Sequence, residues 1–355
     1  MPLFEDTFLV HGRLPIRFIA PAWAKGFKCL EGNCGLCCVT DPPPNMRKMR
    51  IDTLENSICG VYVTKSRRCK KYQDRPIGCL KYPFMIGIEP PGLSLSVCLS
   101  CPSTNSQDYT VRESVEQMFL NKSVTEYVMS LAHCYNSAAS RPEIWRNAVD
   151  SWKAIGDAVR ECVVNDASFP LRPRIQDVSI KTVAHLLGIS EPPMTHPPLR
   201  EALRTKFSGI YIATRFHSNR LCSVRTIGRK TRITLFDSDF GVVKDTGMEA
   251  PTSPIFKKMN AEARNLLRDY VDFLVKRPFT SLAAYTSAFV NGLIVPFNIL
   301  SEFIGNFEVL DAGATLIAMR DDLIEIDAES FREIISFSDG VLNSTFNNPQ
   351  VAIEH

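Results

Sequence analysis

Nine of the chain's 12 cysteines fall between Cys29 and Cys101, and this cluster constrains the fold more than any other feature of the sequence. Their spacing is C-x4-C-x2-C-C-x20-C-x9-C-x9-C-x18-C-x2-C. Thiolate sulfur is the ligand form of cysteine, and it selects zinc, copper(I) or iron–sulfur clusters. The short-spaced groups at the two ends suit a metal centre held between distant segments of chain. The predicted metal ligands are Cys29, Cys34, Cys37, Cys38, Cys59, Cys69, Cys79, Cys98 and Cys101.

The length and the hydrophobic content bound the domain organisation. A chain of 355 residues with 45% hydrophobic residues can bury a large core, and this length favours more than one domain. We predict a cysteine-cluster metal-binding domain over 1–103, a mostly helical region over 104–200, and mixed antiparallel strands and helices over 201–355. The predicted fold class is α+β, with little regular structure in the small metal-stapled N-terminal domain.

Local patterns place the expected helices and strands. Capping boxes at Thr110-x-x-Glu113 and Ser140-x-x-Glu143 each predict the start of a helix. Further helices are expected near 178–188, over 255–305 and over 328–337. Strand patterns occur over 208–243, and the segment 309–326 is expected to form a strand, a turn and a second strand. Cys134 and Cys162 lie on the predicted helices and are expected to be small core residues. Neither of them is expected to be a metal ligand, and nor is Cys222, which lies at an apolar position of a predicted strand.

Charge is distributed unevenly along the chain. Residues 1–103 carry 14 Lys and Arg against 8 Asp and Glu, hence +6, and the remainder carries −3, which together give the formal net charge of +3. Basic residues beside coordinated thiolates offset their charge and lower their pKa, so a solvated rim around an anionic centre is the simpler interpretation. The alternative is that the basic cysteine domain binds an acidic protein or nucleic acid.

Targeting signals give a further expectation. The first residues, MPLFEDTFLVHGRLPIRF, lack a basic segment followed by an apolar one, so no secretory signal is predicted. No run of about 18 apolar residues exists, so no membrane span is expected. We therefore expect a cytoplasmic protein, and a reducing cytoplasm makes a disulfide framework the weaker explanation of the cysteines.

A second pattern surrounds the middle cysteines. Residues 69–84 read CKKYQDRPIGCLKYPF, between the opening CGLCC and the closing CLSCP. Together these strings resemble the YkgJ-type cysteine-cluster family, which is described as a zinc- or iron-chelating domain. The matching positions within 27–102 are the nine cysteines with Gly35, Tyr72, Arg75, Pro76, Tyr82, Pro83 and Pro102. The chain departs from the family in the four-residue first gap and in the Gly-Val-Tyr that follows Cys59. Flagellin lysine methylases of the FliB type carry a similar cysteine domain, and that similarity implies an iron–sulfur cluster.

The other residues of this string have expected roles of their own. Arg75 is predicted to stack on Tyr72 or to donate to a thiolate sulfur, so both residues are assigned to cofactor binding. Pro76 is expected to begin a short helix that presents Cys79. Tyr72, Tyr82 and Phe84 are predicted to form a hydrophobic lid that keeps water from the metal centre.

Three classes of function remain open, and the sequence does not decide whether the protein is an enzyme. They are an iron–sulfur protein of the YkgJ type, an iron–sulfur-dependent protein lysine methyltransferase, and a zinc-stapled module for binding protein or nucleic acid. Four thiolates hold one zinc or one [4Fe–4S] cluster. The adjacent Cys37 and Cys38 cannot easily both point at one tetrahedral zinc, and nine thiolates exceed one zinc site. These two points favour an iron–sulfur cluster. No P-loop, G-x-S-x-G or H-E-x-x-H string occurs.

Overall fold

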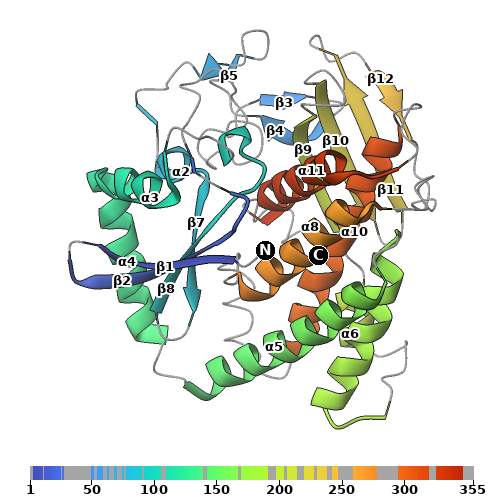
Figure 1. The fold of residues 1–355 in the computed structure, drawn as a ribbon, viewed down its shortest axis with the longest axis horizontal. Coiled ribbons are helices and arrows are strands. Elements are labelled where there is room, and N and C mark those ends of the chain that lie inside the picture. Colours follow the sequence, from blue (N-terminus) through green and yellow to red (C-terminus); the bar gives the residue numbers. More distant parts are fainter. Residues whose placement is uncertain are drawn as a thin grey trace.

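The structure is a computed structural model that describes most of the chain in 21 segments. The described residues are 3–10, 12–24, 26–27, 49–51, 54–58, 62–63, 68–69, 74–75, 77–89, 92–104, 109–138, 142–166, 169–190, 197–203, 206–213, 220–227, 230–237, 242–246, 259–277, 295–319 and 325–346. Figure 1 shows the N-terminal sheet in blue and teal on one side and a second sheet in olive and yellow on the other. The orange and red helices near the C-terminus lie between the two sheets.

The N-terminal sheet has the strand order β1-β2-β8-β7. Its strands are β1 (Leu3–Val10), β2 (Leu14–Pro21), β7 (Phe84–Glu89) and β8 (Gly92–Val97). The β1–β2 and β7–β8 pairs are antiparallel, whereas β2 and β8 pair in parallel. Side chains of a strand point alternately to the two faces of its sheet. Phe18 of β2 and Leu95 of β8 are paired neighbours whose side chains are both fully buried. The expectation of little regular structure in this region is therefore wrong for these strands.

The segment between these two hairpins carries most of the cysteines, and only parts of it are described. These parts are two short antiparallel pairs, β3 (Met49–Ile51) with β4 (Leu54–Ile58) and β5 (Tyr62–Val63) with β6 (Arg68–Cys69), and the one-turn helix α2 (Ile77–Leu80). A 3-10 turn, η2 (Pro102–Thr104), follows β8. The predicted ligands Cys29, Cys34, Cys37, Cys38 and Cys59 lie outside the described residues.

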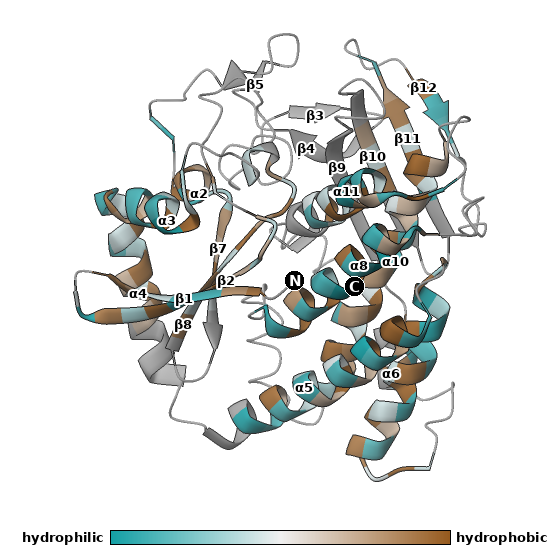
Figure 2. Cartoon of the chain, viewed as in Figure 1, coloured by the Kyte–Doolittle hydropathy of each residue, from teal (hydrophilic) through white to brown (hydrophobic). Residues whose placement is uncertain are grey.

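Helices dominate the middle of the described chain. They are α3 (Val111–Phe119), α4 (Lys122–Ala138), α5 (Pro142–Asn165), α6 (Arg172–Leu186) and α7 (Pro197–Ala202). The first capping box is confirmed, because Thr110 Oγ1 accepts from the amide of Glu113 at 3.2 Å and the Glu113 carboxylate accepts from the amide of Thr110 at 2.8 Å. Ser140, in the second capping box, lies outside the described residues. Figure 2 shows hydrophilic and hydrophobic residues interleaved along α5, as expected for a helix with one buried side.

The second sheet is an antiparallel meander with the order β12-β11-β10-β9, which confirms the strands expected over 208–243. Its strands are β9 (Lys206–Ala213), β10 (Arg220–Ile227), β11 (Lys230–Phe236) and β12 (Val242–Asp245). Cys222 on β10 is fully buried, as is Val224 two residues further along. These strands and helices together confirm a mixed α+β fold.

Three long helices form the last part of the described chain: α8 (Ala261–Lys276), α10 (Val295–Ala318) and α11 (Ala328–Phe346). The strand–turn–strand expected over 309–326 is wrong, because Val309 to Ala318 continue α10. Ile326 makes only an isolated parallel bridge to Met259. Within the described residues, no helix is both long enough and apolar enough to cross a bilayer.

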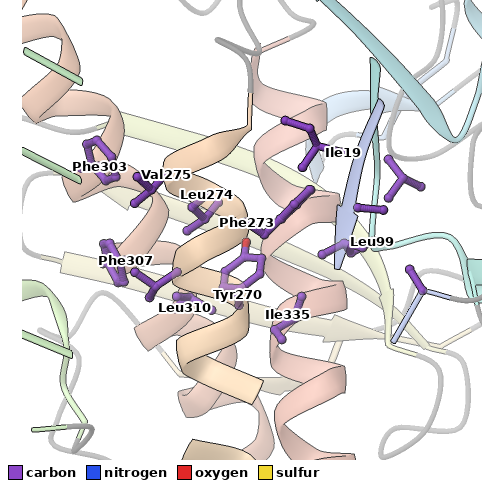
Figure 3. Packing of buried hydrophobic residues seen from close by; sticks show 14 of the residues in the cluster. Ile19, Leu99, Tyr270, Phe273, Leu274, Val275, Phe303, Phe307, Leu310 and Ile335 are labelled. Carbon is purple, nitrogen blue, oxygen red and sulfur yellow. The ribbon is translucent and has the colours of Figure 1, made fainter. Parts of the chain in front are cut away.

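One hydrophobic cluster draws residues from the N-terminal sheet, from α3 to α6 and from the three last helices. Figure 3 shows α8 at its centre, with Tyr270, Phe273, Leu274 and Val275 between two groups of side chains. On one side lie Phe303, Phe307 and Leu310 of α10, and on the other lie Ile19, Leu99 and Ile335. Leu99 belongs to the second C-x2-C pair, so the cysteine region is anchored directly in this core.

Candidate metal centre

The C-x2-C pair of Cys98 and Cys101 forms a turn directly after β8. The amide of Cys98 donates to the carbonyl of Pro83 at 2.7 Å, and the amide of Cys101 donates to the carbonyl of Cys98 at 3.3 Å. A further bond from Thr104 to the carbonyl of Cys101, at 3.1 Å, leads into η2. Both cysteine side chains are buried, with exposed fractions of 1% and 7%. The turn therefore presents two sulfur atoms inside the protein.

Each of these sulfur atoms contacts a serine hydroxyl two residues further along. Cys98 Sγ lies 2.7 Å from Ser100 Oγ, and Cys101 Sγ lies 2.9 Å from Ser103 Oγ. Ser100 Oγ also lies 3.1 Å from the hydroxyl of Tyr82. A thiolate only accepts, so with ionised cysteines the serine hydroxyls would donate to sulfur. Such hydrogen bonds orient metal ligands and tune the electronic properties of the metal.

Cys79 lies on the segment that supports this turn. It is buried on the one-turn helix α2, which confirms the short helix predicted to present it. Hydrogen bonds from Lys81 to Ile77 and from Phe84 to Lys81 connect α2 to β7. Between them lies Pro83, whose carbonyl accepts from Cys98 and whose peptide bond to Tyr82 is cis. One short segment thus carries a third cysteine and holds the C-x2-C turn.

The opposite side of the turn is held by Asp339 of α11. The amide of Leu99 donates to Asp339 Oδ2 at 2.8 Å. The Tyr270 hydroxyl and Arg277 Nη1 both donate to Asp339 Oδ1, each at 3.1 Å. Arg277 Nη2 also donates to the sulfur of Met85 on β7 at 2.6 Å. Asp339 and Tyr270 are fully buried, and Arg277 is 7% exposed.

Burial controls the titration of these groups. Burial, together with the Asp339 carboxylate, raises the pKa of the Cys98 thiol to about 12, although hydrogen bonds with Ser100 and the Arg277 guanidinium oppose the shift. Burial and the same carboxylate raise the pKa of Tyr270. Burial alone would lower the pKa of Arg277, but Asp339 reverses the effect and the pKa is raised. Arg277 and Asp339 therefore form a buried ion pair beside the cysteine turn.

The structure gives less information on the other residues that the sequence assigned to the site. Cys69 lies on β6, where only its backbone is described, and Tyr72 lies outside the described residues together with its predicted contact to Arg75. The Arg75 side chain is partly buried. Phe84 is a core residue, because its ring packs edge-on against Phe27 at 5.3 Å between centroids. Among the described residues, no three cysteine, histidine or acidic side chains form a group that could hold a metal, so the full ligand set remains a prediction.

The sequence did not indicate the anchoring residues Asp339, Tyr270 and Arg277. Asp339 is the one acidic residue in the segment IISFSDGVL, and a charge within an apolar helical run is a sign of a buried ion pair. Tyr270 and Arg277 give no comparable signal in the sequence.

Comparison with known proteins adds no relative: no family model, no curated protein and no solved structure matches this chain. The resemblance to the YkgJ-type family therefore depends on the cysteine spacing and the string from Cys69 to Phe84.

Proposed function

We propose that this protein binds an iron–sulfur cluster of the YkgJ type through its cysteine cluster, and that the cluster has a structural or redox role. The observation that carries the proposal is the buried C-x2-C turn of Cys98 and Cys101, with a serine hydroxyl on each sulfur atom. Buried sulfur with hydrogen-bond partners suits a ligand, because an iron–sulfur cluster needs thiolates shielded from solvent. When bound, such a cluster supplies one-electron transfer.

The surroundings of Cys98 argue against a catalytic nucleophile. Reactive cysteines are partly exposed and have a lowered pKa, since the thiolate is the attacking form. Cys98 is buried, and burial raises the pKa of its thiol to about 12. A thiol of this kind loses its proton when a bound metal supplies positive charge. The chain's own contribution is then to hold the sulfur atoms, exclude water and donate hydrogen bonds to them.

The choice of iron–sulfur over zinc depends on the first cysteine group. Cys37 and Cys38 are adjacent, and a cluster with several irons offers them separate ligation points. A single zinc site would also leave five of the nine cysteines unused. Zinc binding would place the protein with the zinc-stapled interaction modules, and the experiment below separates these two outcomes.

The test compares three alanine variants, each made at a buried cysteine. Cys98→Ala and Cys101→Ala remove candidate ligands, whereas Cys222→Ala removes a fully buried thiol of the second sheet. After anaerobic purification, the wild type and Cys222→Ala should show visible iron–sulfur absorbance and equal iron content. The two ligand variants should lose most of both. Full iron content in both ligand variants, or zinc without iron in the wild type, would contradict the proposal.

A further inference from the structure

The ion pair of Asp339 and Arg277 lies beside the cysteine turn and is almost completely inaccessible to solvent. We propose that Asp339 and Arg277 are positioning residues for the metal centre: they fix the Cys98–Cys101 turn and set the reduction potential of the bound cluster with charges of opposite sign. This inference depends on the proposed function, and it goes beyond it by assigning control of the centre to residues of α8 and α11.

The first step is the connection between the pair and the turn. Asp339 Oδ2 accepts the amide of Leu99, which is the residue directly after Cys98. Ser336, one turn earlier on α11, donates to the carbonyl of Ser100 at 3.5 Å. The turn is thus held on both an amide and a carbonyl by one face of the same helix. Any rotation of α11 at this level would move the ligand turn with it.

The second step is the arrangement of the groups around the carboxylate. Tyr270 and Arg277 both donate to Asp339 Oδ1, which leaves Oδ2 for Leu99. Arg277 is itself fixed by Met85 of β7 and lies over the ring of Phe273, with the central guanidinium carbon 5.3 Å from the ring centroid. Four elements therefore hold the two charges in place: β7, the end of β8, α8 and α11.

The third step is why a buried ion pair is present here. Removing two charges from water is costly, and a buried pair is often replaced by apolar residues without loss of stability. Stability alone is therefore a weak reason for the pair. Both charges lie beside the cysteine turn: Asp339 accepts the amide of Leu99, the residue directly after Cys98, and Arg277 donates to the same carboxylate. Fixed charges at this position act on an electron added to a metal bound at the turn.

The sign of each effect follows from electrostatics. Reduction adds negative charge to a cluster, so the Asp339 carboxylate disfavours it and the Arg277 guanidinium favours it. Neutralising Asp339 should raise the reduction potential, and neutralising Arg277 should lower it. A purely structural role predicts no such opposition, because loosening the turn from either side exposes the centre in the same way.

The experiment measures the reduction potential of anaerobically purified wild type, Asp339→Asn and Arg277→Gln. We expect shifts of opposite sign, each about tenfold or more in the equilibrium constant for reduction. The double variant Arg277→Gln/Asp339→Asn, which leaves no unpaired buried charge, should return close to the wild-type value. Asp311→Asn is the matched control, since Asp311 is also a fully buried carboxylate that accepts backbone amides, and it should leave the potential unchanged.

A milder variant keeps the test decisive if a single charge change prevents folding. Tyr270→Phe removes one donor to Asp339 without changing any charge, so the carboxylate is less compensated and the potential should fall. Shifts of the same sign in Asp339→Asn and Arg277→Gln, an unchanged potential in Tyr270→Phe, or a double variant whose potential stays far from the wild-type value would overturn the inference.

A failure of the proposed function would be visible separately. It would appear in the wild type as protein without iron and sulfide, before any variant is compared. In that case the positioning role of Asp339 is tested by the rate of hydrogen exchange at the Leu99 amide and by the rate of thiol labelling at Cys98 and Cys101. Both should increase at least tenfold in Asp339→Asn and not in Asp311→Asn, and equal behaviour of the two variants would overturn it.

Discussion

The Asp339 carboxylate of α11 accepts a hydrogen bond of 2.8 Å from the amide of Leu99, 240 residues earlier in the chain. This contact joins the C-x2-C turn to the hydrophobic cluster around α8, where the Leu99 side chain is also buried (Figure 3). The cysteine turn and the helix α11 are therefore in direct contact, although they lie far apart in the sequence.

Metal removal should consequently loosen α11 as well as the cysteine turn. Structural metal sites in small peptides contribute on the order of 10 kcal/mol, and we expect a smaller but measurable loss of thermal stability here. Hydrogen exchange before and after chelation should rise in residues 98–104 and also around Ser336 and Asp339. A rise confined to the cysteine region would contradict the coupling across the Leu99–Asp339 bond.

Two glycines of α10 offer a test of its packing against α11. A Cβ at Gly313 would lie 2.9 Å from a ring carbon of Phe337 and 3.3 Å from the carbonyl oxygen of Ile334, whereas a Cβ at Gly305 would meet nothing within 4 Å. Gly313→Ala should destabilise the protein by about 1–3 kcal/mol through overpacking. Gly305→Ala should stabilise it by up to about 1 kcal/mol, because alanine favours a helix. Denaturant unfolding measures both, and equal effects would refute the close approach of the helices at Gly313.

The helix α10 shows where the prediction from sequence failed, and α8 provides a contrast. Because α8 has exposed residues on one side, its apolar residues recur at helical spacing. From Phe303 to Ile317, α10 is buried on nearly every side, and a helix without a polar face has no periodic signal to separate it from a buried strand. Gly313 lies where α10 packs closely against α11, and this role depends on a partner helix that local sequence does not reveal.

The candidate site was predictable only in part. Pro76 indicated the short helix of Cys79, because proline is favoured at the first position of a helix, and the C-x2-C spacing identified Cys98 and Cys101 as candidate ligands. The ion pair of Asp339 and Arg277 was missed, since its members are 62 residues apart from each other and far from Leu99 in sequence. Contacts of this range depend on how helices pack, and no local pattern records them.

Asp311 should make stability depend on pH. It accepts the amides of Leu171 and Arg172 at the start of α6, at 2.7 and 2.8 Å. Burial raises the pKa of Asp311 to about 7, against those two bonds and the charges of Arg174 and Arg172. The unfolded carboxyl has a pKa near 4, so the folded state binds more protons between about pH 4 and pH 7. This contribution to stability is complete below about pH 4 and is lost as the pH rises to about 7.

The measurement compares the free energy of unfolding of wild type and Asp311→Asn across this range. Because asparagine does not titrate, the difference between the two proteins isolates Asp311. The wild type's free energy of unfolding, relative to that of the variant, should fall by up to a few kcal/mol between pH 4 and pH 7. A difference that stays constant or grows with pH would show that the bonds to Leu171 and Arg172 keep Asp311 ionised throughout.

The cysteines outside the cluster should not be ligands. Cys222 is fully buried in the second sheet, and Cys162 lies partly buried on α5, where burial raises the pKa of its thiol. The triple variant Cys134→Ala/Cys162→Ala/Cys222→Ala should therefore keep its ratio of metal to protein, measured after anaerobic purification. Loss of one whole metal ion or cluster per chain would show that one of these cysteines is a ligand.

The central claim is the iron–sulfur cluster, and the most direct measurement is the iron, acid-labile sulfide and zinc content of wild-type protein never exposed to air. The buried sulfur atoms of Cys98 and Cys101 and the adjacent Cys37 and Cys38 predict iron and sulfide in near-equal amounts. Stoichiometric zinc without sulfide would contradict the account and place the chain among zinc-stapled modules.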